Sequence, residues 1–130
     1  MMKDQKLWTW HLLAGVVILV FLGMHMTVMH LDALVNLPGL NPADGHPIDW
    51  ANVVARGKIM FFPITYVILL GAALFHGLYG LRNILLELNP APWLAKTIGV
   101  VLVLLGFGLF AVGSWAALTA HTVAVATKVV

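Results

Sequence analysis

Three long runs without a formally charged side chain constrain the fold of this 130-residue chain more than any other feature. They extend from Leu12 to Met29, from Ile59 to Leu81 and from Ile98 to Ala120. Each is long enough for an apolar helix that crosses a bilayer, which needs roughly 20 residues. With 62% hydrophobic and 9% charged residues, the composition does not suit a soluble domain with a buried core. The sequence therefore predicts an all-α membrane protein with three transmembrane helices.

Prolines, glycines and charged residues set the expected boundaries inside one membrane domain, residues 1–130. The expected elements are helix I at about 8–34, a loop with a short interfacial helix at 35–57, helix II at about 58–88 and helix III at about 93–127. Asp49 is the expected N-cap of the interfacial helix. Pro63 falls either in the first turn of helix II or at a kink. Helix I is expected to stay in the mature protein, because no Ala-x-Ala cleavage pattern ends it.

The charged residues and the cysteine content indicate the orientation in the membrane and exclude some partners and cofactors. With the N-terminus inside, four lysine and arginine residues lie inside and three outside, so the sequence favours an N-in, C-out topology. The basic residues stand singly at segment ends, so we expect no nucleic-acid partner. The chain has no cysteine, which excludes disulfides, thiolate-bound clusters and covalently attached c-type haem.

His76 is the residue that most strongly indicates a function. It lies inside the second uncharged run, where an ionisable side chain is expensive to bury and typical of a functional site. Gly80, one turn further, leaves space beside the imidazole, and Arg82 follows at the interface. A nitrogen ligand, space and a nearby cation predict haem-iron ligation by His76. The alternative is a buried imidazole that bonds to a neighbouring helix, near Tyr66 or Ser114.

Two further histidines, His25 and His30, lie near the end of helix I. They are five residues apart, about 140° around a helix, so only one of them should face a given cofactor. His25 is deeper in the apolar run and is the expected ligand, with His30 as the alternate. His46 and His121 are left outside the site.

Depth separates His25 from His76. His25 lies about 21 Å along the helix from His11, whereas His76 lies about 9 Å from the inner surface. The two histidines should therefore not share one iron. Each would need an axial partner from another chain, which predicts two stacked haems in a helical bundle shared with a second subunit.

Two other functions remain open. Thioethers and imidazoles in the segment from Met24 to His30 could handle Cu(I), although they spread around the helix. Gly99, Gly106 and Gly113 in helix III form a sevenfold stripe that lets another helix approach closely. The stripe would also suit a haem-free structural anchor.

The pattern His76-x-x-x-Gly80-x-Arg82-x-x-x-x-Glu87 resembles helix II of the cytochrome b membrane-anchor subunits of succinate dehydrogenase and fumarate reductase, of the small three-helix type. His11-Leu12-Leu13-Ala14-Gly15 is similar in position to that family's entry to helix I. Leu12 and Ala14 stand where one type of anchor subunit has an arginine and a serine that help to bind quinone.

This resemblance implies a subunit that carries haem b, anchors an iron-sulfur subunit and a flavoprotein subunit, and passes electrons to or from a membrane quinone. It implies two haems per complex shared with a second anchor subunit, contact with membrane lipid, and a place in the cytoplasmic (inner) membrane of a prokaryote. Trp8, His11 and Glu87 are the expected contacts with quinone or the iron-sulfur subunit. The dicarboxylate active site is expected on another subunit, so this chain would act in an enzyme only as part of a complex.

Overall fold

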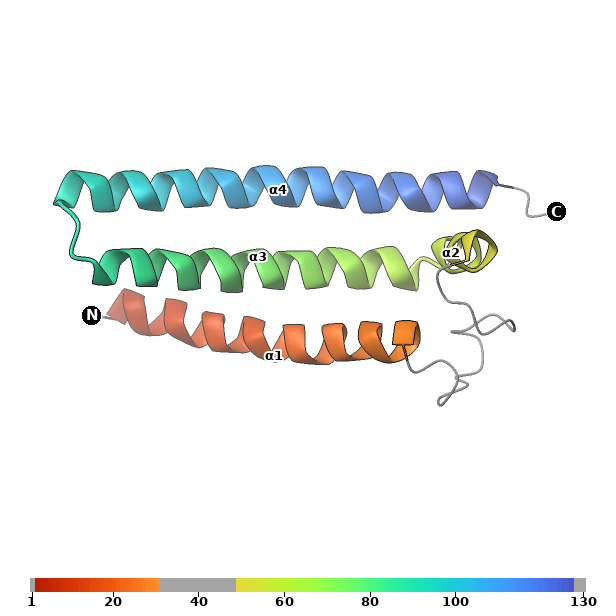
Figure 1. The fold of residues 1–130 in the computed structure, drawn as a ribbon, viewed down its shortest axis with the longest axis horizontal. Helices are drawn as coiled ribbons and strands as arrows, with labels where there is room; N and C mark the ends of the chain where they lie inside the picture. Colours follow the sequence, from red (N-terminus) through yellow and green to blue (C-terminus); the bar gives the residue numbers. More distant parts are fainter. Residues whose placement is uncertain (1, 31–48, 128–130) are drawn as a thin grey trace.

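The computed structural model describes residues 2–30 and 49–127, and that part of the chain is helical (Figure 1). The helices are α1 (Met2–His30), α2 (Trp50–Gly57), α3 (Phe61–Glu87) and α4 (Pro92–Ala126). In length and composition α1, α3 and α4 are each able to cross a membrane, which confirms the predicted three spans. α1 begins earlier than the predicted residue 8, and the expected continuation of helix I to residue 34 lies outside the described residues.

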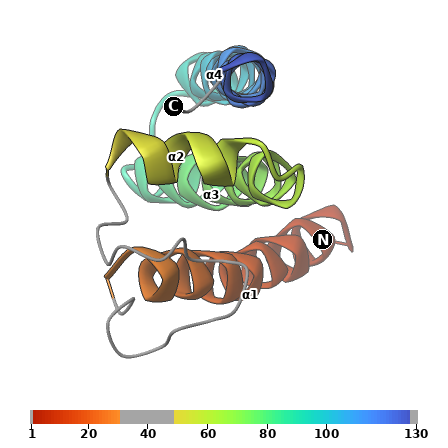
Figure 2. The same cartoon turned by 90° about the vertical axis from the view of Figure 1, so that its right-hand side faces the viewer.

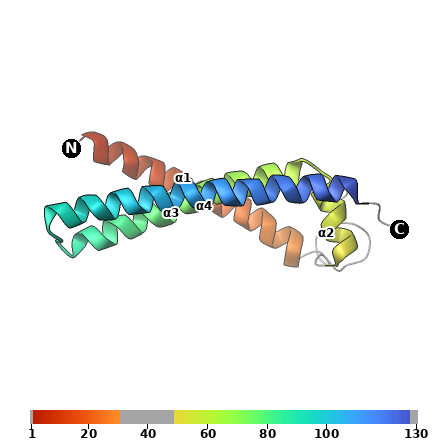
Figure 3. The same cartoon turned by 90° about the horizontal axis from the view of Figure 1, so that it is seen from above.

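The three long helices lie in a row, with α3 between α1 and α4 (Figures 1 and 2). Seen from above, α1 crosses α3 obliquely, whereas α4 runs alongside it (Figure 3). Among the described residues α1 and α4 make no contact with each other. The chain therefore forms a single layer whose two faces stay open, and its buried apolar side chains are few: Ala14, Val54, Phe62 and Ala124.

Local sequence explains where the helices begin and end. α3 begins at Phe61, so Pro63 falls in its first turn, where the missing N–H costs no intrahelical hydrogen bond. Asp49 is the N-cap of α2, but its side chain makes no capping bond. Asn89 has a φ of 52°, a left-handed conformation that asparagine tolerates, and it reverses the chain between α3 and α4. Pro92 then occupies the first turn of α4.

The glycine stripe of α4 packs against α3, as the sevenfold spacing predicts. A Cβ atom at Gly106 would lie 2.9 Å from Leu78 Cδ1, and one at Gly113 would lie 2.5 Å from Leu70 Cδ2. A Cβ at Gly99 would lie 3.7 Å from Nε of Arg82. Each glycine thus makes room for a long side chain of α3, which brings the two helices close together.

α2 lies across the ends of α3 and α4, far from the N-terminus (Figure 1). It buries Asn52, Val54 and Arg56, so two of its three buried side chains are polar. A Cβ at Gly57 would lie 2.8 Å from Cβ of Ala124, so the absence of a side chain lets α2 touch α4. We call this the α2 end of the layer, and the opposite end, where α1 and α4 begin, the histidine end.

Candidate functional site

His76 packs directly against His11 at the histidine end. The two imidazole rings are stacked, with centroids 4.0 Å apart and an angle of 9° between their planes. The Nδ1 atom of His76 lies 3.1 Å from the backbone carbonyl oxygen of His11. These contacts join α1 to α3 at the residue that the sequence singles out most strongly.

Two glycines make this close approach possible. A Cβ at Gly15 would lie 3.2 Å from Cε1 of His76, and a Cβ at Gly80 would lie 3.5 Å from Cε1 of His11. Each histidine is followed four residues later by one of these glycines, so each pair lies on one face of its helix. In the antiparallel pair α1 and α3, each imidazole therefore fills the space left by the glycine of the other helix. The space expected beside Gly80 is thus next to His11.

The hydrogen bond of His76 selects the tautomer of its neutral ring. A carbonyl oxygen can only accept, so Nδ1 of His76 must carry the proton and donate it. In the neutral ring this leaves a lone pair on Nε2, which makes no hydrogen bond within the described residues. A neutral His76 ring with this bond therefore keeps Nε2 available as a ligand.

Aromatic side chains surround the stacked pair. The ring of Trp8 stacks on His11 at 5.5 Å, and the ring of Tyr79 lies 5.2 Å from His11 at a tilt of 48°. Tyr79 in turn stacks on Phe75 at 5.8 Å. Nδ1 of His11 is buried and has no hydrogen-bond partner among the described residues. Buried polar atoms without a partner are rare and often mark functional sites.

The stacked geometry allows only one of the two histidines to be an axial ligand of a given iron. Two trans ligands must point a nitrogen at the metal from opposite sides. His11 and His76 instead lie face to face with nearly parallel planes, so neither ring points its edge at the other. His11 would therefore not be the second ligand of a metal held by His76.

His25 lies in a different part of the molecule. Its ring meets the edge of Tyr66 at 5.8 Å, in a small hollow that Met24 and Met29 also line. Tyr66 is ten residues before His76 on α3, or about 15 Å along the helix. The structure thus places His25 and His76 apart, each against its own partner. Met26, which the copper interpretation also needs, is exposed and does not line this hollow.

The other residues expected at the site are dispersed. Arg82 lies beside Gly99 of α4, whereas His76 lies beside α1, so the two side chains leave α3 on different sides. Glu87 is the exposed last residue of α3, about 16 Å along the helix from His76. The side chain of His30 lies outside the described residues, as does His46.

Sequence reasoning missed Gly15 and Tyr79 as parts of this site. The repeated spacing His11-x-x-x-Gly15 and His76-x-x-x-Gly80 is the signal that could have found the first. His121, which the sequence analysis leaves out of the site, bonds elsewhere: its Nδ1 donates to the carbonyl oxygen of Gly57 at 2.7 Å. Within residues 2–30 and 49–127, no group of three or more histidine or acidic side chains lies close enough together to hold a metal ion.

Comparison with known proteins gives no further guide, because no family model, no curated protein and no solved structure matches this chain.

Proposed function

We propose that this chain is a haem b-binding membrane-anchor subunit of a succinate dehydrogenase or fumarate reductase complex. The single observation that carries the proposal is the hydrogen bond from Nδ1 of His76 to the carbonyl oxygen of His11. Histidines that ligate a metal characteristically donate their second N–H to a carboxylate, carbonyl or water, which orients the ring and makes the ligating nitrogen more basic. The motif from His76 to Glu87 supplies the link to this family.

The residues at His76 fit a haem. The imidazole sits inside an apolar span with Nε2 available, and the layer leaves its faces open for a flat cofactor and for a second subunit. When bound, a haem supplies one-electron transfer, with a potential tuned by its axial ligands and the polarity around them. Within this chain, His76 binds, the carbonyl of His11 orients it, and Gly15 and Gly80 keep the pair in contact.

The rest of the assembly belongs to the same proposal. His25 would hold a second haem, and a second anchor subunit packed on the open layer would supply the remaining ligands. The N-terminus faces the cytoplasm of a prokaryote, which places the histidine end near the iron-sulfur and flavoprotein subunits. Quinone then exchanges electrons at this end, near Trp8 and His11. Arg82, whose Nε lies near Gly99, would pair with a propionate.

Haem content tests the proposal. The full-length chain is purified with its partner subunits, and b-type haem per chain is measured as the pyridine haemochrome. His76→Ala and His25→Ala are each expected to lose one haem per complex. His121→Ala is the matched control, because this membrane histidine already bonds to Gly57, and it should keep the parent's content. Equal haem in all four proteins would refute the proposal.

A haem-free structural anchor is the second candidate, and one observation favours it. His76 already has a hydrogen bond and a stacking partner within the chain, so its polar group is satisfied in part without a cofactor. This function predicts that the purified complex has no haem absorbance and that His76→Ala lowers its thermal stability.

A further inference from the structure

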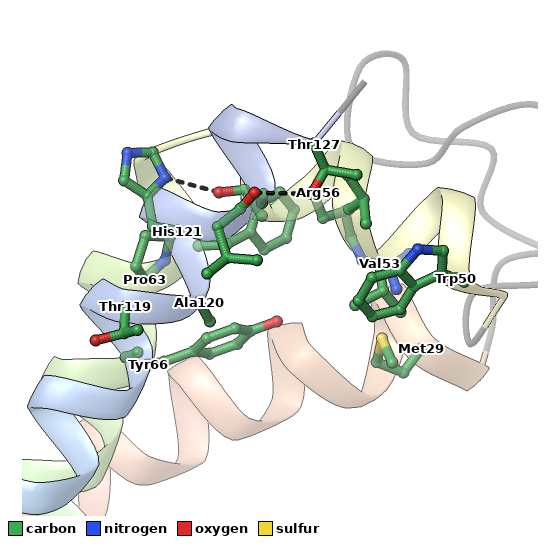
Figure 4. Close-up of a pocket in the computed structure, with 16 residues that line it drawn as sticks. Met29, Trp50, Val53, Arg56, Pro63, Tyr66, Thr119, Ala120, His121 and Thr127 are labelled. Atoms are coloured by element: carbon green, nitrogen blue, oxygen red, sulfur yellow. Dashed lines mark hydrogen bonds between the residues drawn. The ribbon is translucent and has the colours of Figure 1, made fainter. Parts of the chain in front are cut away.

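A cavity of about 410 Å³ lies at the α2 end, where α2 crosses the ends of α3 and α4 (Figure 4). Most of its wall is apolar, with contributions from Val53, Phe62, Pro63, Ala117, Ala120 and Val123. Pockets of this size, apolar with a few polar groups, are typical of small-molecule sites. The cavity is remote from His76 and plays no part in the proposed electron transfer.

The wall also carries polar side chains, among them Arg56, Tyr66 and His121. Arg56 lines the wall and is only 5% exposed, and its guanidinium carries a permanent positive charge. The hydroxyl of Tyr66 points into the cavity and makes no hydrogen bond within the described residues (Figure 4). A cation and a hydroxyl donor beside apolar walls match a ligand with an anionic head and a hydrocarbon tail.

The depth of the cavity supports the same ligand class. Its walls come from the first turns of α3, the last turns of α4, Met29 near the end of α1, and α2, which lies beyond the apolar spans. Trp50, at the rim, is 69% exposed, and Lys58 follows directly after α2. Tryptophan and basic residues at the end of a span are typical of the lipid head-group region, where they attract anionic lipids.

We propose that this cavity binds an anionic phospholipid, with a stretch of acyl chain against the apolar walls and the phosphate at Arg56 and Tyr66. The charge of Arg56 decides between ligand classes. Phosphate gains charge-assisted hydrogen bonds from a buried guanidinium, whereas a neutral carbonyl compound such as a quinone gains only an ordinary hydrogen bond. The bound lipid would bridge α2 to the long helices.

The test measures lipid binding to the delipidated full-length chain in a neutral detergent, by native mass spectrometry and thermal midpoint. The probes are dioleoyl phosphatidylglycerol, dioleoyl phosphatidylcholine, inorganic phosphate and a short-chain ubiquinone. Phosphatidylglycerol should bind at least tenfold more tightly than phosphatidylcholine. Inorganic phosphate, which has no tail, should neither bind comparably nor stabilise the protein.

Matched variants locate the binding. Arg56→Gln should abolish the preference for phosphatidylglycerol, whereas Lys58→Gln, which removes the same charge at an exposed position, should keep it. Ala120→Phe should fill the cavity and weaken binding at least tenfold, while Ala111→Phe, on the same helix but outside this cavity, should not. Circular dichroism checks that each variant is folded.

Four results would overturn the proposal. The first is equal affinity for the two lipids, and the second is an equal loss of phosphatidylglycerol binding in Arg56→Gln and Lys58→Gln. The third is binding of inorganic phosphate as tight as that of the lipid. The fourth is ubiquinone binding that Ala120→Phe removes, while phosphatidylglycerol does not bind. The last result would reassign the cavity to a neutral redox ligand.

Discussion

The two ends of the layer differ in how closely their helices pack. At the histidine end, two imidazoles and two glycines interlock across α1 and α3, and the rings stack at 4.0 Å. At the α2 end, a short helix with buried polar residues leaves a cavity of about 410 Å³. The first arrangement suits a residue that must be held in one orientation. The second suits a surface that admits a ligand.

The difference between the ends follows from side-chain size. Glycine at positions 15 and 80 brings the backbones close enough for a carbonyl oxygen to accept from an imidazole on the other helix. At the α2 end, Gly57 is the one glycine among the described residues that permits such an approach, opposite Ala124. This contact and the hydrogen bond from His121 to Gly57 attach α2 to α4 but do not fill the space beside it.

The largest effect is expected from Gly15→Leu. Its side chain would overlap the His76 ring, which is held by both a hydrogen bond and stacking and therefore cannot move aside cheaply. We expect the free energy of unfolding in detergent to fall by about 1 to 3 kcal/mol. Gly23→Leu is the control, since a Cβ there meets nothing within 4 Å. Equal thermal midpoints for the two variants would show that Gly15 and His76 are not closely packed.

Gly113→Leu should have the next largest effect. A Cβ at this position would lie 2.5 Å from Cδ2 of Leu70, but that methyl ends a flexible side chain and can shift. We therefore expect a smaller loss than for Gly15→Leu, about 1 kcal/mol. The measurement is thermal unfolding beside Gly108→Leu, because Gly108 has no neighbour within 4 Å. A greater loss of stability than in Gly15→Leu would show that the glycine stripe of α4 contributes more to stability than the packed histidines and glycines of α1 and α3.

His121→Ala tests the attachment of α2. It removes a hydrogen bond of 2.7 Å to the carbonyl of Gly57, worth about 1 kcal/mol. Amide hydrogen exchange in α2 should become faster, with little change at the histidine end. Thr122→Ala is the control, because that hydroxyl bonds only within α4, to the carbonyl of Thr119. Unchanged exchange in α2 would mean that the other contacts of α2, such as Gly57 with Ala124 and its buried side chains, hold the helix without this bond.

Much of the fold could be predicted because hydrophobic length dominates it. The three uncharged runs predict the spans, and the sevenfold spacing of Gly99, Gly106 and Gly113 predicts that a helix packs closely there. The spacing does not predict which helix packs against these glycines. Contacts such as Gly106 with Leu78 depend on the rotation of α3, and both faces of a membrane helix are apolar.

The candidate site could be predicted only in part, for a related reason. The depth of His76 follows from its position in the run, and so does its separation from His25. Its contact with His11 depends on how α1 and α3 face each other, which no hydrophobic stripe fixes. The hydrogen bond from His121 to Gly57 could not be predicted from the sequence either, because it joins a membrane span to a helix that lies across its end.

The smallest effect is expected from Tyr79→Phe, which tests how closed the histidine end is. The ring stays 5.2 Å from His11, and the lost hydroxyl makes no hydrogen bond with any described residue, so stability should change by less than about 0.5 kcal/mol. Tyr79→Ala also removes the ring contact and should cost about 0.5 to 1.5 kcal/mol more. Thermal unfolding of both variants gives the comparison. If Tyr79→Phe proves as damaging as Tyr79→Ala, the hydroxyl must reach Nδ1 of His11, the buried nitrogen that otherwise has no partner. The histidine end would then be a hydrogen-bonded network rather than a stack held by shape.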